Sequence, residues 1–489
     1  MTIRFIKSNI EEKFKRNYKE GNIFVSCVEA RSELYAKIGL QHSLLTKKNS
    51  FIFFTNKRIY KSFIKKHKEN NLVKFILINL SPNNKELKNR IKKGWLMLSS
   101  LSHKKLQIFL HNCHSSIATD RNIKHSRAGF LSNDELIGYI ASYLFEEREI
   151  FKKDFFNKNS FIICEGTTLI DHILCFILNE FGVGTIIPSH SRIPQGKMVI
   201  HKDLYETNFL KEEQSKNIDI NFLNNSKIIE YSEICLSQAE LLYSKKYKSF
   251  AKRIIRNIYR YFYSKIYNID SFNRTSISTS LDVFLCAIFK KKIIYFINFL
   301  NQEKIKNCNK IIYYMHVTPE RSVDVLSDLP KEQNQNLLLK NICKNLSENQ
   351  KLIIVPHPSE IRISQYFFIF CLFFKYKNVV LKSSYNKYEN NYPVVSIAGS
   401  IIQERSLRNL PTYHCCDIYI AKGLNKIKYI NGEHLLSLIE KGKHKEGKLE
   451  NPSEILPSKS NTHNFSLFTI NTKIEDIRIL LNTIYDSYA

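Results

Sequence analysis

The stretch QKLIIVPHP, residues 350–358, is an apolar run that ends abruptly on a histidine between two prolines. Proline cannot donate to the ladder of a central strand, and an unpaired histidine is costly to bury. The run therefore predicts a buried strand that stops at a polar edge. A strand that ends in a plain exposed turn is the alternative, and the neighbouring segments decide between the two.

Short β-rich runs alternate with longer helical patterns on both sides of this stretch. Such alternation predicts βαβ units and a parallel sheet, so we expect the α/β fold class. The predicted strands lie at 22–27, 50–56, 72–80, 105–113, 160–166 and 183–190 in the first half, and at 309–317, 350–358, 377–384 and 392–399 in the second.

A segment of different character separates the two halves. Residues 236–305 are predicted to be helical and basic, and the part between Leu241 and Ile269 holds eight Lys or Arg and no acid. A basic amphipathic helix fits docking on an anionic membrane surface, and a solvated linker face is an equal alternative. The predicted domains are therefore 1–235, a helical basic linker at 236–305, and 306–489.

The charge is far from balance, because 74 Lys+Arg against 45 Asp+Glu leave a formal net charge of +29. Such a charge invites a nucleic-acid partner, but no zinc-finger or RNA-recognition signature is present. An excess of Lys, Asn, Ile, Tyr and Phe is also the residue usage of an AT-rich coding sequence. We therefore expect no nucleic-acid partner, although a nucleic-acid-binding protein remains an alternative.

Cysteine usage and hydropathy bear on the compartment. The eleven cysteines are scattered, mostly in apolar runs, without a CxxC pair, which favours buried thiols in a reducing compartment over disulfides or a structural zinc. No segment approaches 18 uncharged apolar residues, and YFFIFCLFF at 366–374 is predicted to be a buried helix. We expect a cytoplasmic protein that at most lies on the inner face of a membrane.

Polar clusters end three of the predicted strands in the second half. They are the stretch from His316 to Glu320, the Pro-His-Pro at 356–358, and the stretch from Ser396 to Ser400. Ligands of parallel α/β sheets bind in the crevice at the carboxyl ends of the strands. We therefore expect the three clusters to meet at one edge and form a site.

Each cluster has a chemical task that fits it. Gly399 and Ser400 form a strand-to-helix turn that favours a phosphate, although a small residue there also suits plain packing. His357 can donate a ring N–H to a phosphate or leaving group. Glu404, one helical turn after Ser400, can reach ribose hydroxyls or merely compensate the helix dipole.

The order of these motifs carries a resemblance. His316-x-x-Pro-Glu320, a strand ending in His357-Pro358, and a Gly399-Ser400 turn followed by Glu404 resemble the nucleotide-sugar-binding half of the bacterial capsule polysaccharide biosynthesis glycosyltransferases. That family includes the Kdo transferases, and its His-Pro motif is similar to the one in bacterial sialyltransferases that use CMP-sugars. The resemblance covers about residues 310–410.

The resemblance implies a GT-B architecture, in which two Rossmann-like domains face a cleft and the C-terminal one holds the nucleotide. His357 would contact the donor phosphate, Gly399 and Ser400 would cradle it, Glu404 would hold the ribose, and His316 and Glu320 would line the same cleft. Members often carry Lys-Glu-His-Pro where this chain reads Val-Pro-His-Pro, and Gly-Thr-Ala-Gly where it reads Gly-Ser-Ile-Ile. The donor identity stays open for that reason.

Candidate catalytic groups lie in the first half. Glu165, a carboxylate at the end of a predicted strand and followed by glycine, is the first choice for the base that takes the acceptor proton. It corresponds to the second acid of the acid-acid-Gly motif of the sialyltransferase-like relatives, and a helix-capping role is the alternative. His190 is a second choice for the base, and Arg192 is a candidate to bind an anionic acceptor.

The sequence thus predicts a glycosyltransferase that moves a sugar from a nucleotide-activated donor to a glycan or glycolipid acceptor. No metal and no cofactor are expected, and a CMP-sugar such as CMP-Kdo is the favoured donor. The alternatives are a nucleotide-sugar epimerase of the same fold and a degenerate, non-catalytic partner in glycan assembly.

Overall fold

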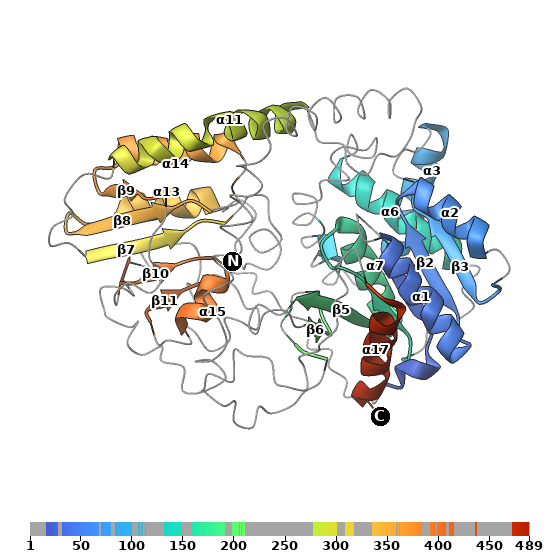
Figure 1. Ribbon diagram of the computed structural model, residues 1–489. Coiled ribbons are helices and arrows are strands. Elements are labelled where there is room, and N and C mark those ends of the chain that lie inside the picture. Colours follow the sequence, from blue (N-terminus) through green and yellow to red (C-terminus); the bar gives the residue numbers. More distant parts are fainter. Residues whose placement is uncertain are drawn as a thin grey trace.

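The chain forms two α/β units, each built on one sheet, in the computed structural model (Figure 1). The described residues are 16–27, 32–67, 70–79, 84–99, 106–107, 109–110, 113, 132–148, 158–190, 198–204, 206, 208–210, 277–300, 309–316, 335–357, 360, 362–383, 392–397, 399–406, 410–414, 436–437 and 472–488.

The first sheet has the strand order β3-β2-β1-β4-β5-β6 and is parallel except for the pairing of β5 with β6. Every residue of β1 and β2 is buried, as is typical of a sheet covered on both faces. The strands are β1 (Ile23–Cys27), β2 (Ser50–Phe54), β3 (Val73–Leu77), β4 (Phe161–Ile163), β5 (Gly184–His190) and β6 (Met198–His201).

Alternate residues of these strands feed two separate cores. Ile23 and Val25 of β1 pack into the core that holds residues of α1 and α17, whereas Phe24 packs into the opposite core with residues of α6 and α7. The helices of this unit are α1 (Ser32–Thr46), α2 (Lys57–His67), α3 (Asn84–Leu98), α6 (Asn133–Arg148), α7 (Leu169–Glu180) and α17 (Ile474–Tyr485), with the 3-10 turns η1 (Tyr18–Glu20) and η9 (Asp486–Tyr488).

The last helix, α17, is fixed to the first sheet by a buried histidine. The His42 Nδ1 atom lies 2.8 Å from the hydroxyl of Tyr485, and the His42 Nε2 atom lies 3.1 Å from the carbonyl oxygen of Gly21. A carbonyl only accepts, so Nε2 carries the proton and Nδ1 accepts from Tyr485. One ring therefore joins α1, α17 and the chain segment before β1.

The second sheet is parallel throughout and has the order β11-β10-β7-β8-β9. One core, which includes most of the buried residues of β7 and β8, lies against its helices. The strands are β7 (Asn309–Tyr314), β8 (Gln350–Val355), β9 (Val379–Leu381), β10 (Val394–Val395) and β11 (Thr412–Tyr413), and the helices are α11 (Ile277–Leu300), α13 (Gln335–Asn345), α14 (Ile363–Lys375) and α15 (Ser400–Ser406).

The predicted α/β fold class is confirmed, since the chain folds as two Rossmann-like units, each built on one sheet. The strand predicted at 105–113 is wrong, because the described residues of that run are helical. The apolar residues of this run recur at helical spacing and pack in the core of the first unit that holds residues of α6 and α7; they are Leu106, Phe109, Leu110 and Cys113.

The helix predicted at 366–374 is confirmed as part of α14, but it is only half-buried. Phe367 and Phe374 are 61% and 70% exposed, so one face of this helix points to the surface. The thiols of the described cysteines are buried apart from Cys371, which lies on the same helix. Among the helices of the described residues, none is long and apolar enough to cross a bilayer.

The predicted domain limits at 235 and 305 fall outside the described residues, as does the basic stretch 241–269, so both stay predictions. Two helices show how segments outside each predicted domain pack on the two units. Helix α11, in the predicted linker range, packs on α14 of the second unit, and α17, in the predicted C-terminal range, packs on α1 of the first.

Candidate functional site

Both sheets contain a switch point, where the strand order changes direction. In the first sheet the chain runs outward from β1 on one side and from β4 on the other, and in the second it does so from β7 and from β10. Open α/β sheets bind ligands outside the carboxyl ends of the strands at such a point. The ends of β1 and β4, and those of β7 and β10, are therefore the two places where a site is expected.

Three polar-cluster residues meet at the second switch point. The His316 Nε2 atom, beyond the end of β7, lies 3.2 Å from the Oγ atom of Ser396, beyond the end of β10. The hydroxyl of Ser396 donates to the carbonyl oxygen of Tyr314 at 3.3 Å, which leaves its oxygen to accept from the imidazole. A Cβ added to Gly399 would lie 3.2 Å from Ser396 Oγ and 3.3 Å from His316 Cε1.

A buried amide fixes the backbone at His316. Gln335, the first residue of α13, accepts from the N–H of His316 at 2.7 Å and donates to its carbonyl oxygen at 3.1 Å. Sequence reasoning missed this residue, because a glutamine at a helix start looks like any solvated residue. Its effect is to hold His316 at the end of β7 in one backbone position.

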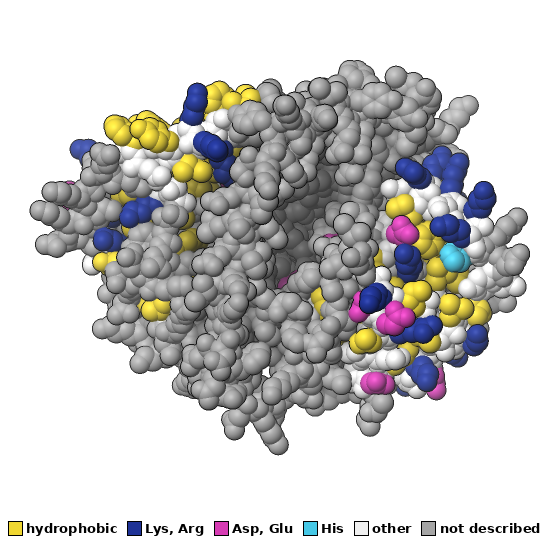
Figure 2. All heavy atoms as spheres, viewed as in Figure 1, with side chains coloured by type: hydrophobic (Ala, Val, Ile, Leu, Met, Phe, Trp, Pro, Cys, Tyr) yellow, Lys and Arg dark blue, Asp and Glu magenta, His cyan; other side chains and the backbone are white. Residues whose placement is uncertain are grey.

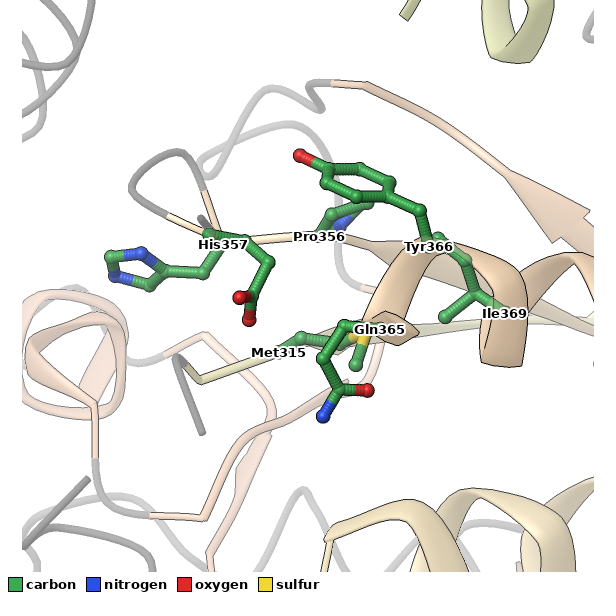
Figure 3. Close-up of a pocket in the computed structure, with 7 residues that line it drawn as sticks. Met315, Pro356, His357, Gln365, Tyr366 and Ile369 are labelled. Carbon is green, nitrogen blue, oxygen red and sulfur yellow. The ribbon is translucent and has the colours of Figure 1, made fainter. Parts of the chain in front are cut away.

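His357 stands at the same level of the sheet edge as His316. The register pairs Tyr314 with Val355, the last residues of β7 and β8, and each histidine lies two residues beyond the end of its own strand. The N–H of Glu360 donates to the carbonyl oxygen of His357 at 2.9 Å and closes the turn after β8. Figure 3 shows the His357 imidazole pointing away from Tyr366, at the outer end of the turn.

A small recess lies under this turn, between it and α14. It is lined by Met315, Pro356, His357, Glu360, Gln365, Tyr366 and Ile369. All of these residues except His357 are buried, and Met315, Tyr366 and Ile369 pack in the core of the second unit. The recess is therefore a part of the support beneath the turn, and His357 lines it with its imidazole pointing away from Tyr366 and Ile369 (Figure 3).

A buried lysine from α11 supports the same turn. The Lys290 ammonium donates to the carbonyl oxygen of Glu360 at 3.0 Å, and a Glu360 carboxylate oxygen accepts from the N–H of Arg362 at 2.9 Å. Burial lowers the pKa of Lys290 to about 8, while Cys286 and Glu360 act in the opposite direction. Lys290, which belongs to the predicted linker range, thus holds the turn that carries His357. Its position within an otherwise apolar stripe of a predicted helix is the sequence feature that marks it.

The other residues predicted to bind the nucleotide-sugar lie wholly or partly outside the described residues. Glu320 and Pro358 lie outside the described residues, and the side chains of Ser400 and Glu404 are likewise outside, although both residues belong to the seven-residue helix α15. That helix is anchored by Arg405, which is fully buried and donates to the carbonyl oxygens of Tyr392 at 2.9 Å and Pro411 at 3.4 Å. These hydrogen bonds hold α15 beside the second switch point.

Glu165 lies at the first switch point, two residues beyond the end of β4, and is half-buried. Gly166 follows with a φ of 68°, a left-handed conformation that suits glycine. The Asp171 carboxylate accepts from the N–H groups of Thr167 at 3.1 Å and Thr168 at 3.2 Å. With the Thr168 hydroxyl it forms a capping box at the start of α7, so the turn that presents Glu165 is held from behind.

Titratable groups are buried behind this turn. Burial raises the pKa of the Asp171 carboxyl, against the lowering effect of hydrogen bonds from Ser26 and the turn. Burial also raises the pKa of the Cys27 and Cys164 thiols, and the Cys164 sulfur lies 3.5 Å from that of Cys175. Asp171 is thus committed to the cap, and Glu165 is the partly exposed carboxylate of the turn.

The other candidate residues of the first half, His190 and Arg192, lie wholly or partly outside the described residues. His190 ends β5 and pairs with Met198 across the antiparallel edge, while its side chain lies outside the described residues. Arg192 lies in residues 191–197, also outside. Within the part of the chain that the structure describes, no group of three or more His, Cys, Asp and Glu is arranged to hold a metal ion.

A comparison with solved structures shows a distant structural likeness. The chain is similar to the UDP-GlcNAc 2-epimerase of Methanocaldococcus jannaschii, solved in complex with UDP-GlcNAc and UDP, with a TM-score of 0.24 and 13% sequence identity. The alignment covers 94% of this chain and 99% of that one. No protein-family model matches the chain, and no curated protein sequence matches it.

Proposed function

We propose that this chain is a glycosyltransferase that moves a sugar from a nucleotide-activated donor to a glycan or glycolipid acceptor of a cell-surface polysaccharide. The observation that carries the proposal is the meeting of His316, Ser396 and Gly399 at the second switch point, with His357 at the same level. These are the polar strand ends on which the resemblance to capsule glycosyltransferases rests, and that resemblance makes a CMP-sugar such as CMP-Kdo the favoured donor.

On the donor side, the second sheet supplies groups that suit a phosphate. An imidazole N–H of His357 donates to the phosphate oxygens, and the wall formed by His316 and Ser396 adds a second polar surface. Gly399 leaves room for the ligand because its missing side chain would fill the space beside that wall. In this proposal Glu320, Pro358 and Ser400 complete the donor site, and Glu404 holds the ribose.

On the acceptor side, Glu165 takes the proton of the attacking hydroxyl, with His190 as the alternative base. The hydroxyl oxygen forms a bond to the anomeric carbon of the donor as the bond from that carbon to the phosphate oxygen breaks. The electron pair of the broken bond remains on the departing nucleotide, whose charge His357 stabilises. Arg192 binds an anionic acceptor, and the basic stretch 241–269 lies on an anionic membrane.

Calorimetry with CMP, UDP and GDP tests the donor site directly. We expect one of the three to bind the wild-type protein, and the His357→Ala variant to bind it at least tenfold more weakly, about 1.4 kcal/mol. His67→Ala is the matched control, because His67 is a half-buried histidine on α2 of the other unit. Its affinity should stay within twofold of wild type, and failure of all three nucleotides to bind would contradict the proposal.

Product analysis then separates transfer from the alternatives that share this site. Transfer releases free nucleotide only when an acceptor is present. Interconversion of the donor sugar without an acceptor would instead identify a nucleotide-sugar epimerase. Nucleotide binding with neither reaction, across a panel of CMP-sugars and UDP-sugars, would favour a non-catalytic partner in glycan assembly.

A further inference from the structure

Helices α11 and α14 lie side by side on the outer side of the second sheet (Figure 1). Their inward stripes, with Cys286 and Ile297 on α11 and Ile369 on α14, are buried in the core of that unit. Between the helices, the rings of Phe296 and Phe370 meet edge to face with centroids 5.6 Å apart. The two helices therefore present one joined outer surface.

That outer surface is strongly aromatic. Tyr295 and Phe299 of α11 are 75% and 57% exposed, and Phe367 and Phe374 of α14 are 61% and 70% exposed. Each pair repeats at helical spacing, so both helices turn an apolar stripe outward, and Figure 2 shows hydrophobic side chains gathered over α11 and α14. A joined patch of exposed aromatic side chains is typical of a surface that binds a partner or a membrane.

The exposed charged side chains that the structure describes on this patch are all of one sign. On α11, α14 and the turn that follows α14, these described side chains are lysines. They are Lys291, Lys292, Lys375 and Lys377. Helix α14 contains no acid, and neither does α11 from residue 283 to its end. Aromatic rings flanked by lysines match the boundary between acyl chains and anionic headgroups.

The same charges argue against a second copy of the chain as the occupant. A two-fold interface would place this patch on itself and bring the lysines of both copies together without acids to pair with them. An anionic bilayer supplies both the apolar layer and the opposite charge. Charge complementarity therefore selects a lipid surface.

We propose that the outward face of α11 and α14 docks the protein on an anionic lipid bilayer, with the aromatic rings in the interface and the lysines on the headgroups. This deepens the membrane contact in the proposed function and rests on it for the nature of the partner. It uses other residues than the stretch 241–269. Vesicle binding is measured without donor or acceptor, so its failure is distinguishable from failure of the transferase activity.

Sedimentation of the full-length protein with vesicles tests the face. We expect binding to phosphatidylcholine vesicles that contain phosphatidylglycerol, and at least tenfold weaker binding to phosphatidylcholine alone. The double variants Tyr295→Ser with Phe299→Ser, and Phe367→Ser with Phe374→Ser, should each lower the partition coefficient at least tenfold. The matched control is Leu44→Ser with Leu96→Ser, since these leucines are 54% and 56% exposed on the first unit; it should stay within twofold.

The exposed thiol of Cys371 gives an independent readout on the same face. An environment-sensitive fluorophore on Cys371 should shift to the blue with anionic vesicles, and a Cys371→Ser sample corrects for label at other cysteines. Absence of vesicle binding would overturn the proposal, as would binding that the face variants leave unchanged. A dimer that the face variants dissociate, without any vesicle binding, would also overturn it.

Discussion

The two switch points have the same topology and opposite chemistry. At the ends of β7 and β10 the structure brings together the imidazole of His316, the hydroxyl of Ser396 and the bare backbone of Gly399. At the end of β4, beside β1, it presents the carboxylate of Glu165 on a turn held by Asp171. One edge offers a paired imidazole and hydroxyl with space beside them, and the other offers a carboxylate.

In the proposed function, this difference divides one reaction between two similar sheets. A departing phosphate needs donors at the moment its charge develops, whereas an incoming hydroxyl needs a base. The supports differ accordingly. The edge proposed for the nucleotide is held by a neutral amide from Gln335 and a cation from Lys290, and the edge that carries Glu165 is held by the buried acid Asp171.

The largest effect should come from breaking the acceptor edge alone. Replacing Glu165 with Gln removes the proposed base and keeps the shape, so we expect turnover of a CMP-sugar with an acceptor to fall by about 10²–10⁴-fold. Nucleotide affinity, measured by calorimetry, should stay within twofold because the proposed nucleotide site lies on the second sheet. Glu180→Gln, at the opposite end of α7, is the matched control and should keep wild-type turnover.

Either of two results would break this division. Equal loss of turnover in Glu165→Gln and Glu180→Gln would mean that only the fold of α7 was disturbed. A loss of nucleotide affinity in Glu165→Gln that matches the loss of turnover would place the donor at the first sheet as well.

The second effect, on stability, concerns the unit that carries Glu165. Burial lowers the pKa of His42 to about 4, against the opposing hydrogen bond to Gly21. Between pH 6.5 and 4 the unfolded chain binds more protons than the native one, so stability falls as the pH falls. From pH 7.5 to pH 5 this residue should cost about 2 kcal/mol of unfolding free energy.

Denaturant unfolding at the two pH values, for wild type and for His42→Gln, measures this cost. The variant should be less stable at pH 7.5 but should lose less on acidification. Hydrogen exchange should place the acid-sensitive opening at α1 and α17, which the ring joins. An unchanged pH slope in the variant would assign the acid sensitivity to other groups.

The sequence predicted what local patterns encode. Apolar runs located most of the strands, and polar residues at their ends located His316, His357 and Gly399 in advance of any contact. The run at 105–113 misled because an apolar stretch that short fits a strand or a buried helix, and only the spacing of Phe109 and Cys113 separates the two.

Contacts between distant segments explain what sequence reasoning missed. Lys290 reaches Glu360 across 70 residues, and His42 reaches Tyr485 across 443, so no local pattern encodes either pairing. Gln335 similarly acts on His316 through the backbone, where residue type alone gives no signal. The contacts that support the candidate site therefore could not be predicted from the sequence, although the polar residues at its strand ends could be.

The smallest effect sharpens the comparison at the donor edge. A methyl group in Gly399→Ala would lie 3.2 Å from Ser396 Oγ and 3.3 Å from His316 Cε1, tighter than ordinary contact. The neighbours must shift by a few tenths of an ångström, and we expect nucleotide affinity to fall about three- to tenfold, about 0.7–1.4 kcal/mol. Calorimetry with the nucleotide that binds wild type measures this directly.

Gly182→Ala separates a local effect from general strain. Gly182 has a φ of 81° with open space around its Cβ position, in the turn that precedes β5 of the first sheet. Alanine there should lower the unfolding free energy by about 1 kcal/mol and leave nucleotide affinity unchanged. Equal affinity loss in both variants would mean that nucleotide binding follows overall stability, and the second switch point would then lose its claim to the phosphate.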